Sequence, residues 1–168
     1  GNVQVICADI LSLDLSQVFP GQASYKVVAA LPYFIASRIL RYFLEAPVKP
    51  SLIVITVQRE VGENIAAKPG DTTLLSIAVQ LYGKPQIVDY LSPWSFYPKP
   101  KVESAIVQID VYPEPALPVR DTNAFFSVVR AGFSSRRKQL HNALALGLGV
   151  PQSDSHRWLT AAGIEPMR

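Results

Sequence analysis

Hydrophobic and polar residues along the first part of the chain follow patterns that predict strands alternating with helices. Residues 2–8 alternate and are rich in β-branched side chains, so they predict a strand that ends at Asp9. Residues 25–30 predict a second, buried strand, and residues 35–45 carry apolar side chains at the spacing of an amphipathic helix. Residues 51–58 form a near-continuous apolar run, which is typical of a central parallel strand covered on both faces.

The pattern continues with two further helices and two further strands. Residues 59–68 and 74–82 predict the helices, and Pro69-Gly70 separates them. Residues 86–91 and 102–112 predict strands that can pair as an antiparallel hairpin. This order of elements predicts an α/β fold.

A proline-rich segment at residues 113–118 (PEPALP) marks a change in composition along the chain. Such segments are typical of the linkers between domains. We therefore expect one domain over residues 1–113 and a second over residues 119–168.

The second domain is expected to be helical throughout. Its apolar positions predict one helix over residues 123–145, which Gly147 and Gly149 break. Ser153 is placed to cap a last helix that runs to Ala162.

Composition limits both the compartment and the chemistry. The chain has 168 residues, of which 49% are hydrophobic and 17% charged, as in folded globular domains. It contains no apolar stretch long enough to cross a membrane. Cys7 is the only cysteine, which excludes an internal disulfide and favours a reducing, cytoplasmic compartment. Because His141 and His156 are the only histidines, we expect no metal site.

Positive charge is concentrated in the predicted helical domain. The whole chain has a formal net charge of +3, whereas residues 120–138 combine five basic side chains with a single acidic one, Asp121. The five are Arg120, Arg130, Arg136, Arg137 and Lys138. Clusters of this kind bind the phosphate backbone of nucleic acids, although a solvated helix face has a similar composition. Lys99 and Lys101 form a second, smaller basic site.

Leu31-Pro32-Tyr33 is the first candidate site, at the carboxyl end of a predicted buried strand. Ligands of open α/β sheets bind at such ends. Proline has no N–H group, so the carbonyls beside it can face a ligand, and the tyrosine ring offers a flat surface for a planar base. The alternative is a strand-ending turn with a packed tyrosine.

Two further candidates are Asp9 and the loop at residues 96–102 (FYPKPKV). The Asp9 carboxylate can accept from a ligand amine or hydroxyl, or it can simply cap the turn that follows. The loop combines aromatic rings that can stack on a base with lysines that can meet phosphate; the alternative is a hydrophobic loop that closes a sheet edge. The sequence contains no Gly-rich phosphate loop, G-x-S-x-G, H-E-x-x-H or paired-cysteine motif, so we expect no acid–base or covalent chemistry through His or Cys.

Several segments also occur in a characteristic order. Residues 25–33 (YKVVAALPY) are similar to a strand followed by an N-L-P-Y motif, and residues 96–105 (FYPKPKVESA) are similar to F-x-P-x-P-K-V-x-S-A. Four more segments match in collinear order: residues 58–70 (QREV…AKPG), 75–82 (LS…QLY), 133–138 (FSSRRK) and 163–168 (GIEP…R). Together these motifs resemble the ribosomal RNA adenine N6,N6-dimethyltransferases of the kasugamycin-resistance type. The macrolide-resistance rRNA methyltransferases look similar too.

The resemblance implies the latter part of a Rossmann-like class I methyltransferase sheet, mostly parallel with an antiparallel final strand, followed by a small all-α domain. It implies transfer of methyl groups from S-adenosylmethionine to adenines of small-subunit rRNA during ribosome maturation. The target adenine must leave its stack to be reached. The family also implies a protein that is a monomer at full length and needs neither a metal nor a membrane.

The resemblance assigns roles around the target base. Tyr33 would stack on the flipped adenine, and Phe96 would support it from the other side. The carbonyl of Leu31 or Pro32 would accept from the exocyclic amine. The first position of the motif, an asparagine in the family, is Ala30 here, so one hydrogen-bond acceptor for the amine is absent from this sequence.

Cofactor and RNA contacts follow from the same resemblance. Asp9, with Ile10 beside it, would match the family's contact to the adenine of the cofactor, and Ala30 would lie at this site too. The family's Gly-rich cofactor loop precedes the point at which this chain starts, so we expect S-adenosylmethionine to bind this chain weakly or not at all. The residues expected to contact rRNA are Lys99, Lys101, Arg130, Arg136, Arg137 and Lys138.

Ala30 keeps a second function open, that of a non-catalytic rRNA-binding factor for ribosome assembly on the same fold. A third interpretation is an α/β domain whose basic helix binds protein or nothing. Transfer of methyl groups to rRNA separates the first two functions, and salt-dependent binding to rRNA separates both from the third.

Overall fold

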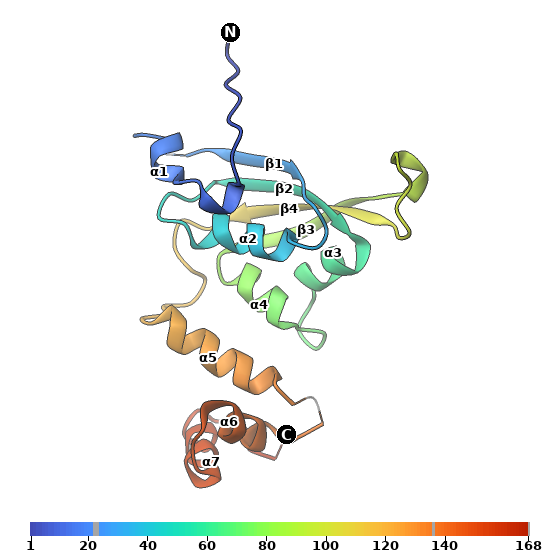
Figure 1. The fold of residues 1–168 in the computed structure, drawn as a ribbon. Helices are drawn as coiled ribbons and strands as arrows, with labels where there is room; N and C mark the ends of the chain where they lie inside the picture. Colours follow the sequence, from blue (N-terminus) through green and yellow to red (C-terminus); the bar gives the residue numbers. More distant parts are fainter. Residues whose placement is uncertain (22–23, 136, 168) are drawn as a thin grey trace. The chain divides into compact units, whose positions relative to one another are not determined.

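The computed structural model describes residues 1–21, 24–135 and 137–167. The chain divides into two compact units, Gly1–Leu117 and Pro118–Arg168. The first unit contains a sheet and short helices, and the second contains helices (Figure 1).

The sheet of the first unit has four strands. They are β1 (Lys26–Ala30), β2 (Leu52–Gln58), β3 (Gly83–Leu91) and β4 (Ser104–Val111), arranged in the order β1-β2-β4-β3. β1 and β2 are parallel, whereas β4 is antiparallel to both of its neighbours. The predicted α/β class and the predicted hairpin of the last two strands are therefore confirmed.

One face of the sheet is covered more completely than the other. Ile53, Ile55 and Val57 of β2 are buried, but the alternate residues Leu52 and Val54 are only half-buried. Helices α2 (Ala36–Glu45), α3 (Arg59–Ile65) and α4 (Leu74–Gln80) all lie on the same side of the sheet (Figure 1). The expectation that β2 is covered on both faces is thus wrong for the described part of the chain.

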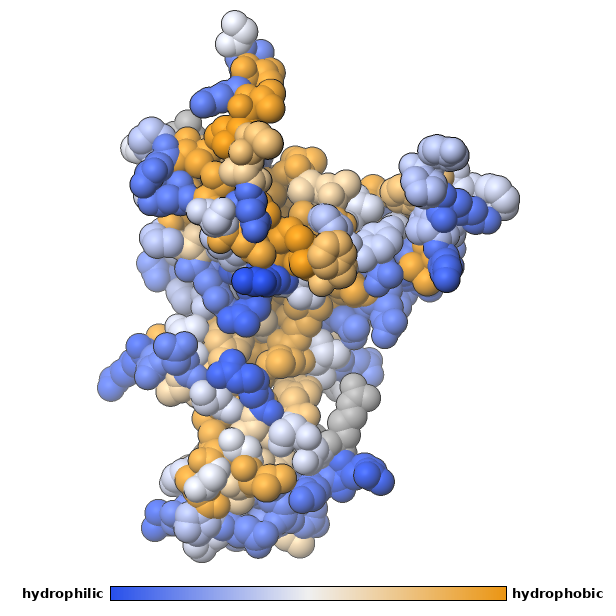
Figure 2. Space-filling model, viewed as in Figure 1, coloured by the Kyte–Doolittle hydropathy of each residue, from blue (hydrophilic) through white to orange (hydrophobic). Residues whose placement is uncertain are grey.

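The prediction of a strand at residues 2–8 is also wrong. These residues have no regular secondary structure, and Val3 and Val5 are exposed. Figure 2 shows the apolar residues of this segment open to solvent. A strand persists only when its backbone groups pair with a neighbour, and no strand of the described residues lies beside this segment. Asp9 consequently follows an irregular segment and caps the 3₁₀ turn η1 (Ile10–Ser12).

The N-terminal segment is held to the first unit just after this turn. η1 is followed by the short helix α1 (Leu15–Val18). The hydroxyl of Tyr42, on α2, donates a hydrogen bond to the carbonyl of Leu13. α2 itself matches the predicted amphipathic helix, with Ile39, Leu40 and Leu44 in the core.

The described residues of the second unit form three helices, α5 (Thr122–Phe133), α6 (Leu140–Leu148) and α7 (Gln152–Ala161). The single helix predicted over residues 123–145 is therefore two helices. α5 ends at Ser134, whose backbone N–H and hydroxyl both donate to the carbonyl of Ala131. A serine that bonds back to the helix offers the backbone an alternative to a further turn.

The glycines predicted to break this helix have different roles. Gly147 lies inside α6, where a Cβ would come within 2.5 Å of the Ala131 Cβ on α5. Gly149 ends α6 with φ of 67°, a conformation that favours glycine. The prediction that Ser153 caps the last helix is wrong, because it lies within α7, which follows Pro151 without a side-chain cap.

The core of the second unit is small and depends on the close approach of α5 and α6. Ala131, Leu144 and Leu159 form its buried centre, with Leu140 and Leu148 packed against them. Gly147 permits this approach because it brings no side chain to the contact with Ala131.

In the part of the chain that the structure describes, no helix is long and apolar enough to cross a membrane. The described residues also contain no group of three or more His, Cys, Asp or Glu side chains that could hold a metal ion.

We predict that Gly147→Ala lowers the free energy of unfolding of the second unit by about 1–3 kcal/mol, because overpacking forces α5 and α6 apart. Urea denaturation followed by circular dichroism measures the change. Gly132→Ala is the matched control, since its Cβ would meet Leu140 Cδ1 at an ordinary 3.7 Å and alanine favours a helix by up to about 1 kcal/mol over glycine. Equal stability of the two variants would contradict the packing role of Gly147.

Candidate functional site

Segments far apart in the sequence meet at one edge of the sheet. The carboxyl end of β1 lies beside β2, with Ala30 opposite Thr56, and the backbone N–H of Leu31 donates to the Thr56 carbonyl over 3.3 Å. Gln58, at the end of β2, lies opposite Ser104, at the start of β4. The loop between β3 and β4 leaves the sheet at the same edge (Figure 1).

A side-chain hydrogen bond joins two of these segments. The Tyr33 hydroxyl and the Ser104 Oγ are 2.7 Å apart. Ser104 is completely buried, whereas Tyr33 is only half-buried. The bond fixes the far end of the tyrosine ring while leaving part of the ring accessible.

The carbonyls of Leu31 and Pro32, the two alternative acceptors predicted from the sequence, differ in their hydrogen bonding. The Pro32 carbonyl accepts from the backbone N–H of Ile35 over 3.1 Å, in the turn that leads into α2. The Leu31 carbonyl accepts no hydrogen bond from the described residues. Leu31 therefore offers the free acceptor at this edge, and Ala30, which is exposed, adds only a methyl group.

The β3–β4 loop carries aromatic and basic side chains. It begins with the 3₁₀ turn η2 (Pro93–Ser95), which Ser92 caps. Phe96 is half-buried, whereas Tyr97 is fully exposed. The Lys99 ammonium lies 3.3 Å from the centre of the Trp94 ring.

Arg59 fastens the end of this loop to the start of α3. Its guanidinium forms ion pairs with Glu63 at 2.8 Å and with Glu103 at 2.7 Å, and it lies 4.9 Å from the centre of the Tyr90 ring. Its backbone N–H also donates to the Glu103 carbonyl over 2.9 Å. The hydrogen bonds to Glu63 and Glu103 raise the pKa of Arg59 above its ordinary value, so the arginine stays charged.

Asp9 and Ile10 lie in different surroundings. The Asp9 carboxylate accepts from the backbone N–H of Leu11 over 3.0 Å, which is the capping role that the sequence left open. Ile10 lines a cavity of about 480 Å³ together with Ala29, Leu31 and other residues of β1, α1 and α2. The structure thus brings Ile10, but not the Asp9 carboxylate, to a cavity beside the end of β1.

That cavity is almost entirely apolar. Among the described residues that line it, Lys26 is the only charged one. The cavity can accept a flat, apolar group, but the described residues that line it include no carboxylate to bind ribose hydroxyls or to face a cationic sulfonium. The residues described here therefore do not form a complete site for S-adenosylmethionine.

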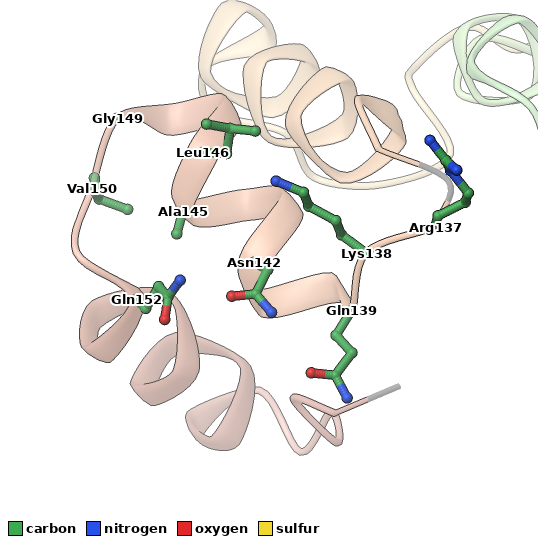
Figure 3. A pocket seen from close by; sticks show the side chains of 9 residues that line it. All are labelled: Arg137, Lys138, Gln139, Asn142, Ala145, Leu146, Gly149, Val150 and Gln152. Atoms are coloured by element: carbon green, nitrogen blue, oxygen red, sulfur yellow. The ribbon is translucent and has the colours of Figure 1, made fainter.

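Two of the basic residues of the second unit line a pocket within that unit. Arg137 and Lys138 line a pocket of about 750 Å³ together with amides and apolar groups of α6 and α7. Figure 3 shows Lys138, Asn142 and Gln152 around it, with the Arg137 guanidinium directed outward. Arg130 donates to the Ser127 hydroxyl on α5. Arg136, which was also predicted to contact RNA, lies outside the described residues.

The sequence of the chain matches the model of a known protein family. The sequence model of a family described as "Ribosomal RNA adenine dimethylase" matches residues 1–163. The chain belongs to this family. The resemblance drawn from its motifs is thereby confirmed.

Curated relatives of the chain agree with the family. It is 45% identical over 168 residues to a protein named "Ribosomal RNA small subunit methyltransferase A" from Dehalococcoides mccartyi, covering 99% of this chain and 57% of that protein. A protein of the same name from Alkaliphilus oremlandii is 40% identical over 174 residues and is covered to 60%. The chain thus spans about three fifths of the length of these relatives.

Solved structures show the same fold. The 23S rRNA methyltransferase ErmE superposes with a TM-score of 0.70 at 24% identity, covering 99% of this chain and 65% of that one. A dimethyladenosine transferase from Plasmodium falciparum superposes with a TM-score of 0.66 at 25% identity, covering 84% of this chain and 52% of that one. The expected Rossmann-like methyltransferase fold is therefore confirmed.

The sequence indicated the motifs around Tyr33 and Phe96, but it did not predict the contacts between them. Ser104 belongs to the quoted F-x-P-x-P-K-V-x-S-A segment, yet its bond to Tyr33 spans 71 positions of sequence. Arg59 and Glu103 also lie in quoted motifs, and their ion pair was not foreseen. The opposite charges of Arg59 and Glu103 were the one signal in the sequence that could have suggested this ion pair.

We predict that Tyr33 and Ser104 are coupled by about 0.5–1.5 kcal/mol in a double-mutant cycle of Tyr33→Phe and Ser104→Ala. Each single variant already loses the hydrogen bond. The double variant should therefore lose less free energy of unfolding than the sum of the two single losses, and the difference is the coupling energy. Urea denaturation of the four proteins measures the coupling. Strict additivity would show that the bond contributes nothing to the fold of this edge.

Proposed function

We propose that this chain forms the target-adenine and rRNA-binding part of an rRNA adenine N6,N6-dimethyltransferase that acts on the small ribosomal subunit during its maturation. Membership of the dimethylase family and the names of its relatives support the proposal. The observation that carries it is the bond between Tyr33 and Ser104, which joins the two motifs around a half-exposed aromatic ring.

The edge of the sheet suits a flipped adenine. An enzyme that works on a base must first take it out of its stack. The Tyr33 ring, held by Ser104, offers a face for that base, and Phe96 is proposed to support it from the loop. The free Leu31 carbonyl is the acceptor for the exocyclic amine, because the Pro32 carbonyl is engaged by Ile35.

We assign the rRNA contacts to exposed basic side chains in both units. Lys99 and Lys101 lie in or beside the β3–β4 loop, and Arg130, Arg137 and Lys138 lie in the second unit. Lysine and arginine at phosphates make binding strongly salt-dependent. In this assignment residues 1–113 are part of the methyltransferase domain and residues 119–168 are part of an RNA-binding domain.

The family implies S-adenosylmethionine as methyl donor and needs no metal. Because the described residues do not complete a site for that cofactor, the role proposed for this chain is to bind and orient the adenine. We place the whole protein in the cytoplasm, in keeping with the single cysteine of this chain and the family's rRNA substrate, and the family implies a monomer.

Ala30 favours a second candidate function, a non-catalytic rRNA-binding factor for ribosome assembly. An acceptor at this position would bind the second hydrogen of the amine. Losing one well-placed hydrogen-bonding group at a reacting centre lowers rates by on the order of 10²-fold. A protein with that loss can still bind rRNA through its basic residues.

We predict that the native gene product containing this chain methylates under-methylated small subunits, and that Ala30→Asn raises its rate by about 10- to 100-fold. Transfer of radiolabelled methyl groups from S-adenosylmethionine measures the rate. Val88→Asn is the control, because it adds the same amide at an exposed strand residue that does not line the cavity beside β1, and it should leave the rate unchanged.

The outcomes of this assay separate the two functions. Activity of the native protein, lost in Tyr33→Ala, supports the dimethyltransferase. Methylation only in the Ala30→Asn variant, with rRNA binding in both, supports the assembly factor. No methylation by either protein and no salt-dependent rRNA binding would contradict both.

A further inference from the structure

The β3–β4 loop exposes two aromatic side chains that the proposed target-base site does not use. Trp94 is 81% exposed and Tyr97 is fully exposed. A ring that packs against its own protein would be largely buried, so neither side chain serves the fold. Large apolar groups left in solvent often mark a binding surface.

The Trp94 ring already has a cation on one face. The Lys99 ammonium lies 3.3 Å from the ring centre, close enough for a cation–π contact. With the ring 81% exposed, its other face is open to solvent. A planar ligand that stacks on that face and carries negatively charged groups would bring those groups within reach of the Lys99 ammonium.

Short contacts hold the loop that presents these rings. The backbone N–H of Trp94 donates to the Ser92 hydroxyl over 3.4 Å, and the backbone N–H of Ser95 donates to the Ser92 carbonyl over 3.0 Å. At the other end, the ion pair between Arg59 and Glu103 fastens the loop to α3. A surface held in place before binding loses less conformational entropy when a ligand arrives.

The charge of the loop favours a nucleic acid over a protein as its ligand. Residues 92–102 contain Lys99 and Lys101 and no acidic side chain. Aromatic rings interleaved with lysines are the usual means of binding single-stranded nucleic acid, in which bases stack and phosphates meet cations.

We propose that Trp94, Tyr97 and Lys99 form a stacking site for an unpaired base of RNA that flanks the methylated adenine. The inference rests on the proposed function and adds a second base-binding site to it. Trp94 stacks on the base through its open face, Tyr97 offers a second ring, and Lys99 and Lys101 meet the neighbouring phosphates. Duplex RNA, whose bases are already stacked, should not occupy this site.

The chain supplies its own reporter, because Trp94 and Trp158 are its only tryptophans. In the Trp158→Phe variant, fluorescence comes from Trp94 alone. We predict that a single-stranded oligoribonucleotide quenches this fluorescence by more than half at saturation, while a duplex of equal length quenches it far less. Trp94→Ala should weaken binding of the single strand by about 5- to 100-fold, the range expected for one stacked base.

Controls make the result specific to stacking. Trp94→Phe keeps an aromatic ring and should retain affinity within about threefold, since stacking tolerates any aromatic face. Trp158→Phe should bind as the parent protein does. Circular dichroism should show the same fold for Trp94→Ala, because the replaced side chain is exposed.

The outcomes distinguish this proposal from the function on which it rests. Salt-dependent RNA binding with unchanged Trp94 fluorescence, or equal quenching by duplex, would overturn the stacking site and leave the proposed function intact. If the parent protein binds no RNA at all, both proposals fail. If Trp94→Ala loses binding to a ribosomal protein and keeps binding to RNA, the loop is a protein-docking site and the proposal is wrong.

Discussion

The hydrogen bond between the Tyr33 hydroxyl and the Ser104 Oγ is the interaction on which the proposed adenine-binding edge of this protein depends. Ser104 is fixed on both sides, since it lies opposite Gln58 of β2 and opposite Leu91 of β3. It is also completely buried, so its hydroxyl has little access to water if Tyr33 is lost. A rigid sheet thereby holds a half-exposed ring in a defined position.

The other parts of the site are arranged around this fixed point. The turn after Tyr33 engages the Pro32 carbonyl and leaves that of Leu31 free, so the direction of the available acceptor is set by the start of α2. The ion pair between Arg59 and Glu103 fastens the β3–β4 loop next to the same edge. Backbone geometry and two side-chain contacts, Tyr33 with Ser104 and Arg59 with Glu103, therefore position the groups at this edge.

Much of the fold could be predicted from the sequence because its patterns are local. The helix at Ala36–Glu45 and the strand at Leu52–Gln58 follow directly from periodic apolar residues. The failures come from partners that a local pattern does not contain. Residues 2–8 have the alternation of a strand but no neighbouring strand among the described residues, and Gly147 lies inside a helix because Ala131 of another helix packs against it.

The candidate site was predictable to a similar extent. The segment around Tyr33 and the loop around Phe96 were found from their residue types and motif spacing. The bond that joins them depends on strand register across 71 positions, which no local pattern shows. The exposure of Trp94 could not be predicted from the sequence either, because it follows from the shape of the β3–β4 loop.

Binding of an adenine at this edge can be measured by an NMR titration of the isotopically labelled chain with adenosine monophosphate. We expect saturable shifts of the amide signals of Leu31, Tyr33, Phe96 and Ser104, and smaller shifts with cytidine monophosphate at the same concentration. Identical shifts with both nucleotides, confined to residues near the lysines and arginines, would show binding of phosphate alone and contradict adenine binding at this edge.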